Sequence, residues 1–396
     1  MLDINLIRKN PEEVKEGIRN KGINPKLVDD FLALDEEWRK LTREVDNLRS
    51  DQKKLSDARN IEEATKIKDK LQLLERDLTQ LESNRNETLS GIPNPPLESV
   101  PIGKNESENV VIKEVGEKPQ FDFKPQDHVE LGKSLDIIDF ESGSKVVGSG
   151  FYYLKNKGVL LELGLVRYAL DFLSKNGFEL LFVPDLARDK FYLGTGYQPR
   201  GPEAQTYEIK DSDLGLIATA EVSLAGIHAD DILAEKDLPK RYAGYSHCFR
   251  QEAGSYGKYS KGLYRVHQFT KVEMFVYAKP EESKKIHEEL LSLEEKLWQG
   301  LDIPYRVLEM CTGDLGSQAA RKFDLEAWMP GRGDWGEITS TSNTTDYQAR
   351  RLNIKLRRKD GKIEFAIAIL ENYQTKDGTV KIPKVLQPYL GFDEIK

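Results

Sequence analysis

An arginine and a carboxylate stand where a predicted strand gives way to a flexible loop. The stretch Cys248–Gly254 leaves that strand and enters a loop rich in glycine and tyrosine, and Arg265–Phe269 returns from it. An arginine at such a strand end can make two parallel hydrogen bonds to a phosphate or a carboxylate. A surface salt bridge between Arg250 and Glu252 would explain the two residues equally well if they stood alone. Arg250 is therefore a candidate phosphate-binding residue.

A hydroxyl and two carboxylates also stand at strand ends. Thr219-Ala220-Glu221 follows the apolar run Gly215–Ala218 directly, and Glu273 lies just beyond the loop's return. Two carboxylates and a hydroxyl can recognise a small ligand that carries an ammonium and a hydroxyl group. Each of these residues taken singly is an ordinary polar side chain.

Glu337 and Ser340 offer oxygen ligands for a cation. They lie in the run Gly336–Asn343, and a carboxylate and a hydroxyl suit a Mg²⁺ ion that bridges phosphates. Two cysteines, Cys248 and Cys311, and five scattered histidines give neither a disulfide framework nor the spacing of a zinc site. We therefore expect no structural transition metal.

These residues need a sheet to position them. A long helix is predicted at Val159–Ser174, and apolar runs bounded by turn residues predict the strands. The predicted strands are Leu180–Val183, Gly215–Ala218, Ala243–Cys248, His267–Val276, Tyr305–Glu309, Lys322–Trp328 and Glu337–Ser340. Most are joined by turns or loops rather than by alternating helices, so we predict an α+β fold with a mostly antiparallel sheet backed by helices.

A helical hairpin is predicted near the start of the chain. Apolar residues repeat there at spacings of three and four, the seam of a coiled coil. One series is Phe31, Leu34, Trp38, Leu41, Val45, Leu48 and Leu55, and the other is Ala64, Ile67, Leu71, Leu74, Leu78 and Leu81. The polar break Ser56–Asn60 suits a turn, so the two helices should fold back as an antiparallel pair. Such a pair in isolation is more often a scaffold or dimerisation element, and its mixed charges indicate a solvated face.

Composition bounds the organisation and the partners. The 396 residues carry a net charge of −8, which argues against non-specific coating of nucleic acid but allows a local basic patch. The prolines of Ile92–Pro96 end the hairpin. We expect one domain over residues 1–98, a linker over 99–125 and a second domain over 126–396. No apolar run approaches the roughly 18 residues that cross a bilayer, and no signal-peptide pattern is present, so we expect a cytoplasmic protein without membrane contact.

The loop around Arg250 belongs to a recognisable series of motifs. Phe249–Glu252 with Arg265–Phe269 resembles motif 2 of the class II aminoacyl-tRNA synthetases. Five runs in order look like the seryl-tRNA synthetases in particular: Arg250–Gly254, Arg265–Phe269, Thr312–Gly316, Glu326–Gly331 and Thr345–Arg351. One such run would be weak, whereas five in order are specific. The resemblance implies a zinc-independent ligase that uses ATP and Mg²⁺ to join L-serine to serine tRNA through a seryl-adenylate.

The resemblance assigns roles by position. Arg250 would be the catalytic residue, binding the α-phosphate of ATP and the serine carboxylate. Glu252 would meet the adenine amino group, Phe269 would stack on the ring, and Mg²⁺ would be held by Glu337 and Ser340. The implied ATP site comprises Arg250, Gln251, Glu252, Val266, Phe269, Glu337, Ile338, Thr339 and Ser340, and the implied serine site comprises Thr219, Ala220, Glu221, Arg250 and Glu273.

The resemblance also implies partners. Val159–Pro184 corresponds to motif 1, the element that forms a homodimer in this family. The hairpin becomes the arm that grips the long variable arm of serine tRNA by its backbone and shape. Selenocysteine tRNA falls within the family's usual range.

One expected segment is missing between Phe365 and Ala366. Family members carry there a third motif, with a segment like Thr-Leu-Asn-x-Thr and an arginine that binds the γ-phosphate. Here Phe365 runs straight into Ala366–Asn372, which matches the helix after that arginine, so a dozen or more residues and one strand are lost. Loss of a central strand should leave N–H and C=O groups of its neighbours unpaired.

The gap leaves a second function open. A synthetase-like protein could bind tRNA or a partner without aminoacylating it, and the missing arginine favours this alternative. The intact set of Arg250, Glu252, Glu273, Glu337 and Ser340 favours the ligase. A class II ligase for another amino acid is disfavoured by the runs Thr312–Gly316 and Thr345–Arg351.

Overall fold

A computed structural model describes residues 1–197, 205–252, 261–360, 363–365, 367–371 and 382–391. The chain divides into two compact units, Met1–Pro96 and Leu97–Lys396, and each is described by itself. The division falls at the prolines that end the hairpin.

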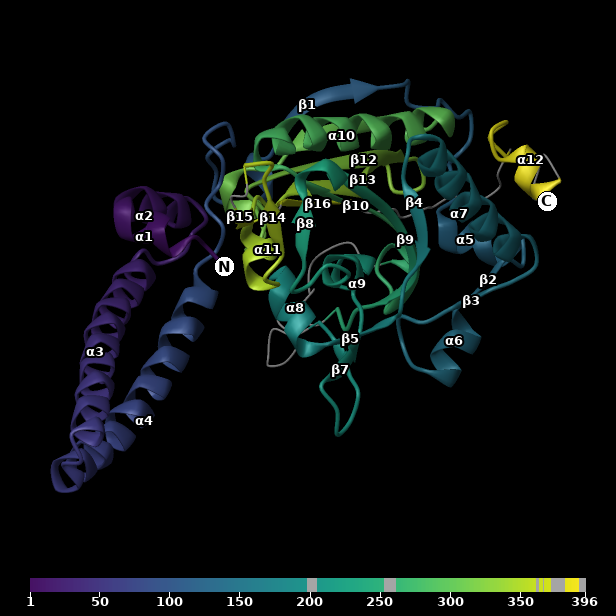
Figure 1. The fold of residues 1–396 in the computed structure, drawn as a ribbon. Coiled ribbons are helices and arrows are strands. Elements are labelled where there is room, and N and C mark those ends of the chain that lie inside the picture. The colour runs from purple at the N-terminus through teal and green to yellow at the C-terminus, as the bar shows by residue number, and fades with distance from the viewer. Residues whose placement is uncertain (198–204, 253–260, 361–362, 366, 372–381, 392–396) are drawn as a thin grey trace. The chain divides into compact units, whose positions relative to one another are not determined.

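The N-terminal unit is built on the helical pair. Two short helices, α1 (Ile4–Lys9) and α2 (Pro11–Asn20), precede the long helices α3 (Lys26–Asp57) and α4 (Ile61–Gly91). Figure 1 shows α3 and α4 side by side, joined at their far ends by the short turn. The side chain of Asn60 caps α4 by accepting the N–H of Glu63, which is the turn chemistry that the polar break predicts. The predicted antiparallel pair is confirmed.

A buried carboxylate ties the base of the hairpin together. Asp35 on α3 is inaccessible to solvent and accepts hydrogen bonds of 2.8 Å from Arg8 on α1 and from Arg85 on α4. The Arg85 guanidinium also lies over the Trp38 ring, 4.7 Å from its centroid. Burial alone would raise the pKa of Asp35, but the two arginines outweigh it and lower that pKa below its ordinary value. One ionised group therefore links three helices.

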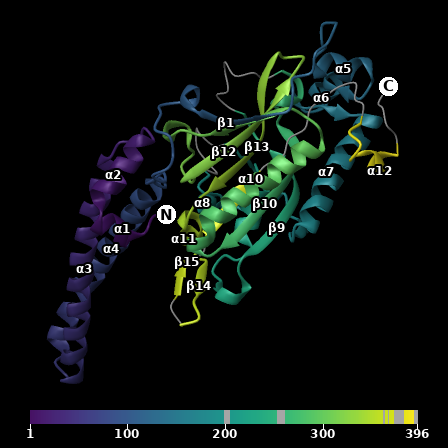
Figure 2. The same cartoon turned by 90° about the horizontal axis from the view of Figure 1, so that it is seen from above.

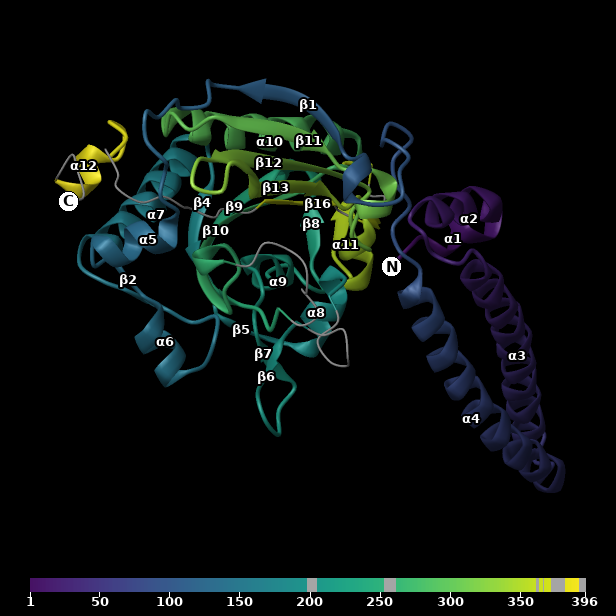
Figure 3. The same ribbon diagram turned by 180° about the vertical axis from the view of Figure 1, so that it is seen from behind.

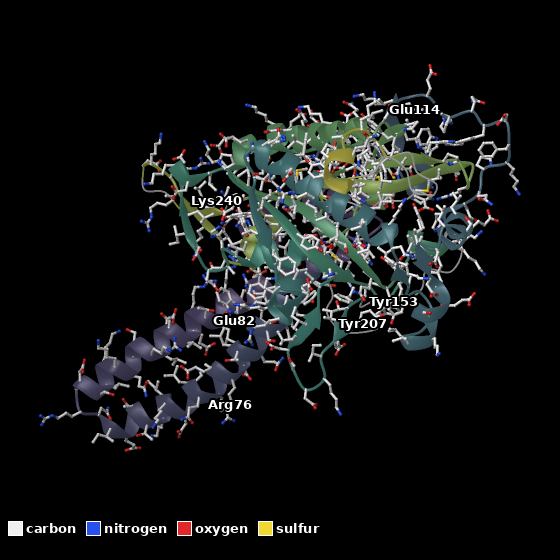
Figure 4. All side chains as sticks on the ribbon, turned by 90° about the vertical axis from the view of Figure 1, so that its right-hand side faces the viewer. Arg76, Glu82, Glu114, Tyr153, Tyr207 and Lys240 are labelled. Carbon is white, nitrogen blue, oxygen red and sulfur yellow. The ribbon has the colours of Figure 1, made fainter. Side chains whose placement is uncertain are left out.

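The remainder of the hairpin surface carries charges of both signs. Ion pairs cross between the helices, with Arg49 bonded to Glu75 at 2.9 Å and Lys70 to Glu44 at 2.8 Å. Figure 4 shows Arg76 and Glu82 both projecting from α4. The pairs are exposed, so each contributes under about 1 kcal/mol to stability.

The second unit is built on one eight-stranded sheet. Its order is β1 (Val110–Val115), β11 (Tyr305–Glu309), β12 (Arg321–Met329), β13 (Asp334–Asn343), β16 (Ile367–Glu371), β10 (Gln268–Ala278), β9 (Lys240–Phe249) and β4 (Glu179–Phe182). Every neighbouring pair is antiparallel except β4 and β9, which are parallel. Figure 3 shows β12, β13 and β16 layered below α10, with β1 at the top of the view. The predicted mostly antiparallel sheet is confirmed.

Helices cover one face of the sheet. Helices α7 (Lys157–Lys175) and α10 (Ser283–Gly300) run along it, as Figure 2 shows, whereas α9 (Ala220–Gly226) contacts β9 and β10 from the other face. Side chains in a strand alternate between faces. Val272 and Met274 of β10 accordingly pack with α7 and α10, while Phe275 and Tyr277 join the core around α9. Lys271 and Glu273 share this second face.

The second unit also contains shorter helices and strands outside the main sheet. They are α5 (His128–Ser134), α6 (Phe140–Val146), α8 (Asp189–Thr195), α11 (Tyr347–Arg351), α12 (Gln387–Leu390), β2 (Ile138–Asp139), β3 (Tyr153–Leu154), β5 (Leu186–Arg188), β6 (Tyr207–Glu208), β7 (Leu214–Leu216), β8 (Ile232–Ala234), β14 (Lys355–Arg357) and β15 (Ile363–Phe365). Strand β14 pairs with β8 and β15, and β7 pairs with β5 and β6. None of the helices among the described residues has the length and apolar character needed to cross a membrane.

Two segments differ from their sequence-based description. Strand β1 lies inside the expected linker 99–125 and forms an edge of the main sheet. The match of Ala366–Asn372 to a helix is wrong for this chain, because Ile367–Glu371 forms strand β16 between β10 and β13. An apolar run with two isoleucines suits a strand, and that position offers hydrogen-bonding partners on both sides. The expected unpaired neighbours are therefore absent where β16 runs, at Phe275–Ala278 and Thr341–Asn343.

Candidate active site

Arg250 leaves the end of β9 and is fixed from two sides. Its Nε donates to the carbonyl oxygen of Ala218 at 3.2 Å, and its backbone N–H donates to the carbonyl oxygen of His267 at 3.0 Å. The guanidinium lies over the Phe269 ring, 5.0 Å from the centroid. A guanidinium has five N–H donors in a planar fork, so the bond to Ala218 still leaves donors for an anion. The structure thus holds a cation beside an aromatic platform.

Glu252 lies two residues after Arg250, where the chain enters the loop. Its backbone is left-handed, with φ of +49°, and its Oε2 accepts from Nη1 of Arg265 at 2.5 Å. Arg265 stands where the chain returns from the loop, so this ion pair joins the two ends of the loop. The sequence analysis assigned no role to Arg265, although its position in the run Arg265–Phe269, which returns from the loop, could have indicated one.

Thr219 and Glu273 form a hydrogen-bonded group with Lys271. Thr219 caps α9 by accepting the N–H of Glu221 at 3.2 Å, and its hydroxyl donates to Glu273 at 2.7 Å. The Lys271 ammonium donates to the same hydroxyl at 2.6 Å and lies 2.6 Å from the Glu273 carboxylate. The sequence analysis did not single out Lys271. Strand alternation could have indicated it, because residues two apart in β10, such as Lys271 and Glu273, lie on the same face.

Glu221 is a second buried carboxylate, close enough to Glu273 and Lys271 to be affected by their charges. Its Oε2 accepts from the Tyr197 hydroxyl at 3.0 Å and its Oε1 from the Gln348 amide at 2.7 Å. Burial raises the pKa of Glu221 to about 7, and the negative charge of Glu273 adds to that rise, while Lys271 opposes it. Tyr197 and Gln348 lie far from Glu221 in sequence, so nothing local pointed to them.

Strand β13 carries an irregularity that matters for Glu337 and Ser340. Leu325 and Glu326 are consecutive in β12, yet they pair with Thr339 and Glu337, so Ile338 is an extra residue in β13. Such a bulge shifts the alternation of side chains by one residue. In a regular strand, residues three apart would point to opposite faces.

The bulge brings Glu337 and Ser340 to one face. Ser340 lies opposite Asp324 and Glu337 opposite Glu326, and Asp324 and Glu326 are two apart in β12 and so share a face. Lys322 lies on this face too and pairs with Asp324 at 3.0 Å. One carboxylate and one hydroxyl are too few for a closed site but fit a Mg²⁺ ion whose other ligands come from a triphosphate and water. Within the described ranges, no three His, Cys, Asp or Glu side chains group as metal ligands.

The other residues of the implied sites make packing contacts and hydrogen bonds within the second unit. Ala220 is fully buried in the first turn of α9, and Val266 packs under the Phe269 platform. Ile338 packs in the core beneath α10, and the Thr339 hydroxyl donates to Glu294 of α10 at 3.3 Å. The Gln251 amide donates to the carbonyl oxygen of Thr206 at 2.8 Å and so anchors the neighbouring chain.

A cavity of about 330 Å³ opens beside Arg250. Its lining includes the polar residues Arg250, Glu252 and Glu337, and also Leu161 and Leu165 of α7. Its lining includes the consecutive β10 residues Phe269–Val272. It lies along the parts of β10 and β13 beyond their described pairing with β16.

Comparisons with known proteins identify the family of this chain. The tRNA synthetase class II core domain (G, H, P, S and T) matches residues 206–372, and the Seryl-tRNA synthetase N-terminal domain matches residues 1–96. The serine–tRNA ligase of Dictyoglomus turgidum is 50% identical over 100% of this chain and 99% of its own length. The chain belongs to the seryl-tRNA synthetase family. That alignment spans 422 positions, 26 more than the 396 residues here, so the relative carries residues that this chain lacks.

Two solved seryl-tRNA synthetases share the fold over the whole chain. The enzyme of Pyrococcus horikoshii, complexed with ATP, is 41% identical with a TM-score of 0.92, covering 100% of this chain and 99% of that one. The cytoplasmic serine–tRNA ligase of Naegleria fowleri, complexed with AMP, is 34% identical with a TM-score of 0.88 and the same coverage. A seryl-tRNA synthetase fold is thus shown on both sequence and structure.

The raised pKa of Glu221 makes a prediction about stability. A carboxyl whose folded pKa of about 7 exceeds its ordinary 4.5 adds stability below pH 4.5 and loses that contribution as pH rises through 7. The loss is about 3 kcal/mol. Glu221→Gln stays neutral, so between pH 5 and pH 8 its free energy of unfolding in urea should fall by about 2.5 kcal/mol less than that of the unaltered chain. Glu82→Gln, at an exposed carboxylate, is the control, and an unchanged pH profile in Glu221→Gln would contradict the burial argument.

Proposed function

We propose that this seryl-tRNA synthetase joins L-serine to serine tRNA in two steps, through a seryl-adenylate formed from ATP. The observation that carries the proposal is the Arg250 guanidinium, held over Phe269 at the end of β9 and beside two buried carboxylates. A non-aminoacylating protein is not favoured, because relatives of about 50% identity over the full length are serine–tRNA ligases.

In the first step a serine carboxylate oxygen attacks the α-phosphorus of ATP and pyrophosphate leaves. Negative charge accumulates on the α-phosphate as the new bond forms, and Arg250 is the fixed cation that stabilises it while also holding the serine carboxylate. Because Ala218 and Phe269 already orient the guanidinium, it needs little reorganisation during the reaction. In the second step a ribose hydroxyl of the tRNA attacks the seryl carbonyl and AMP leaves.

The nucleotide would lie on the Phe269 side of Arg250. Phe269 supplies a ring for stacking on adenine, and the Glu252 carboxylate, oriented by Arg265, accepts from the adenine amino group. Glu337 and Ser340, brought to one face by the bulge, would hold Mg²⁺ with the triphosphate. That ion supplies charge neutralisation for the phosphates when bound.

Serine would occupy the pocket between α9 and β10. Glu273 and Glu221 are acceptors for its ammonium and hydroxyl groups, and Thr219 and Ala220 form the wall at the start of α9. Burial strengthens these contacts, since water does not compete for the carboxylates. The same burial gives selectivity, because a ligand without the hydroxyl leaves a buried acceptor unpaired.

The hairpin of α3 and α4 would hold the tRNA. The N-terminal domain match covers it entirely, and its exposed surface mixes lysine and arginine with acidic residues. A surface of mixed charge suits recognition of backbone and shape at chosen points rather than general attraction to phosphate. Serine tRNA is the proposed substrate, with selenocysteine tRNA as a second one, and we place the enzyme in the cytoplasm.

A homodimer would form through α7 and β4. Apolar side chains gather there in the open, with Leu163 on α7 55% exposed and Phe182 on the edge strand β4 71% exposed. Leu160 on α7 and Leu180 on β4 are also exposed apolar side chains. Contiguous exposed apolar surface beside an open sheet edge is typical of an interface between subunits.

Arg250→Ala tests the catalytic assignment. Serine-dependent ATP–pyrophosphate exchange should fall by about 10²- to 10³-fold, because the fixed cation at the α-phosphate is lost. Arg241→Ala is the matched control, since Arg241 lies on the same strand but pairs with Glu289 of α10. Exchange near the unaltered rate in Arg250→Ala would refute the role given to Arg250.

Two variants and one control test the division of labour between the units. Leu163→Asp combined with Phe182→Asp should give a monomer in light scattering, whereas Ile112→Asp on the opposite edge strand β1 should remain a dimer. Deletion of Phe31–Leu89 should leave a dimer that still forms seryl-adenylate but charges tRNA poorly. A monomeric deletion product would overturn this partition.

A further inference from the structure

Lys271 is a buried cation with no part in the roles described so far. It is 2% exposed, and it stands on β10 two residues before Glu273, which is 1% exposed. Taking a lysine ammonium out of water costs several kcal/mol unless partners replace the lost solvation. A chain keeps such a group only where its partners fit closely, so its contacts show what it does.

The contacts form a closed triangle of hydrogen-bond distances. Lys271 Nζ lies 2.6 Å from Thr219 Oγ1 and 2.6 Å from Glu273 Oε2, and these two oxygens lie 2.7 Å apart. The Thr219 hydroxyl also accepts the backbone N–H of Glu221. A hydroxyl has one donor and two acceptor positions, so these three bonds use its full capacity. Thr219 therefore acts in this arrangement as a spacer that orients Glu273, with no hydrogen left to offer a substrate.

The ammonium also balances the charge of the pocket. Glu221 and Glu273 are both buried, and the charge of Glu273 raises the pKa of Glu221 while that of Lys271 lowers it. Without the cation, two carboxylates in one dry pocket would bind a proton between them. The pocket would then lose an anionic acceptor for the substrate ammonium, and Thr219 would lose one of the contacts that fix its hydroxyl.

We infer that Lys271 is a positioning residue for the amino acid: its ammonium holds the Thr219 hydroxyl and the Glu273 carboxylate in one arrangement and thereby sets the affinity for serine. It touches the residues that bind serine rather than the reacting atoms. The inference rests on the proposed function, since it concerns the serine pocket of that reaction. It predicts an effect on the amino acid and none on the nucleotide, which a purely structural ion pair would not.

Lys271→Met tests this by ATP–pyrophosphate exchange with each substrate varied in turn. The KM for serine should rise about 10- to 100-fold, the usual loss when a buried charged hydrogen bond is removed, while the KM for ATP changes less than about twofold. Arg321→Met is the matched control. It removes a cation that pairs with Glu309 at 2.7 Å in the same sheet, so it should lower the unfolding midpoint and leave the KM for serine unchanged.

Chemical rescue separates positioning from stability. Lys271→Ala leaves a gap in which methylammonium fits, and the amine should lower the KM for serine without changing that for ATP. If Lys271→Met does not fold, Lys271→Gln, which keeps an N–H₂ donor group but no charge, replaces it in the same assay. An unchanged KM for serine in a folded variant, or an equal rise for both substrates, would overturn the inference. Absence of serine-dependent exchange in the unaltered chain would instead overturn the proposed function.

Discussion

Strand β10 contributes side chains to the apolar core on one face of the central sheet and to the candidate active site on the other. Its alternation sends Val272 and Met274 into the core beneath α7 and α10, and Lys271 and Glu273 into the pocket against α9. A slip of one residue in the pairing with β9 would exchange the two sets and put charged groups into the core. The apolar residues thus fix the register, and the register fixes the buried charges. Thr219 depends on that strand for Lys271 and Glu273, and Arg250 depends on it for the Phe269 ring.

Much of the site can be predicted from sequence because its residues stand beside strands with clear boundaries. The apolar strands that precede Arg250 and Thr219, and the returning strand that carries Glu273, lie within a few residues of their predicted limits. The contacts between distant segments cannot be predicted in this way. Gln348 reaches Glu221 only because α11 and α8 pack together, which no local pattern encodes.

The bulge at Ile338 and strand β16 show two further limits. Regular alternation would separate Glu337 from Ser340, and only the pairing with β12 shows that an extra residue brings them to one face. For Ile367–Glu371, similarity to a helix in relatives is overruled by the surroundings. An apolar run placed between two strands gains hydrogen bonds on both sides, so its tertiary position decides its conformation. The adjoining cavity lies where this short strand does not extend.

The central claim is that two buried carboxylates and a fixed arginine make this chain an enzyme that activates serine. The most direct measurement is ATP–pyrophosphate exchange by the unaltered chain with serine, threonine or alanine at saturating ATP. Serine should support the fastest exchange. Threonine keeps the hydroxyl and should be disfavoured only by the fit of one methyl group, about 1–3 kcal/mol, whereas alanine leaves a buried acceptor unpaired and should be slower by up to about 10⁴-fold. Comparable exchange with alanine and serine would show that the hydroxyl is not recognised, and would contradict the account.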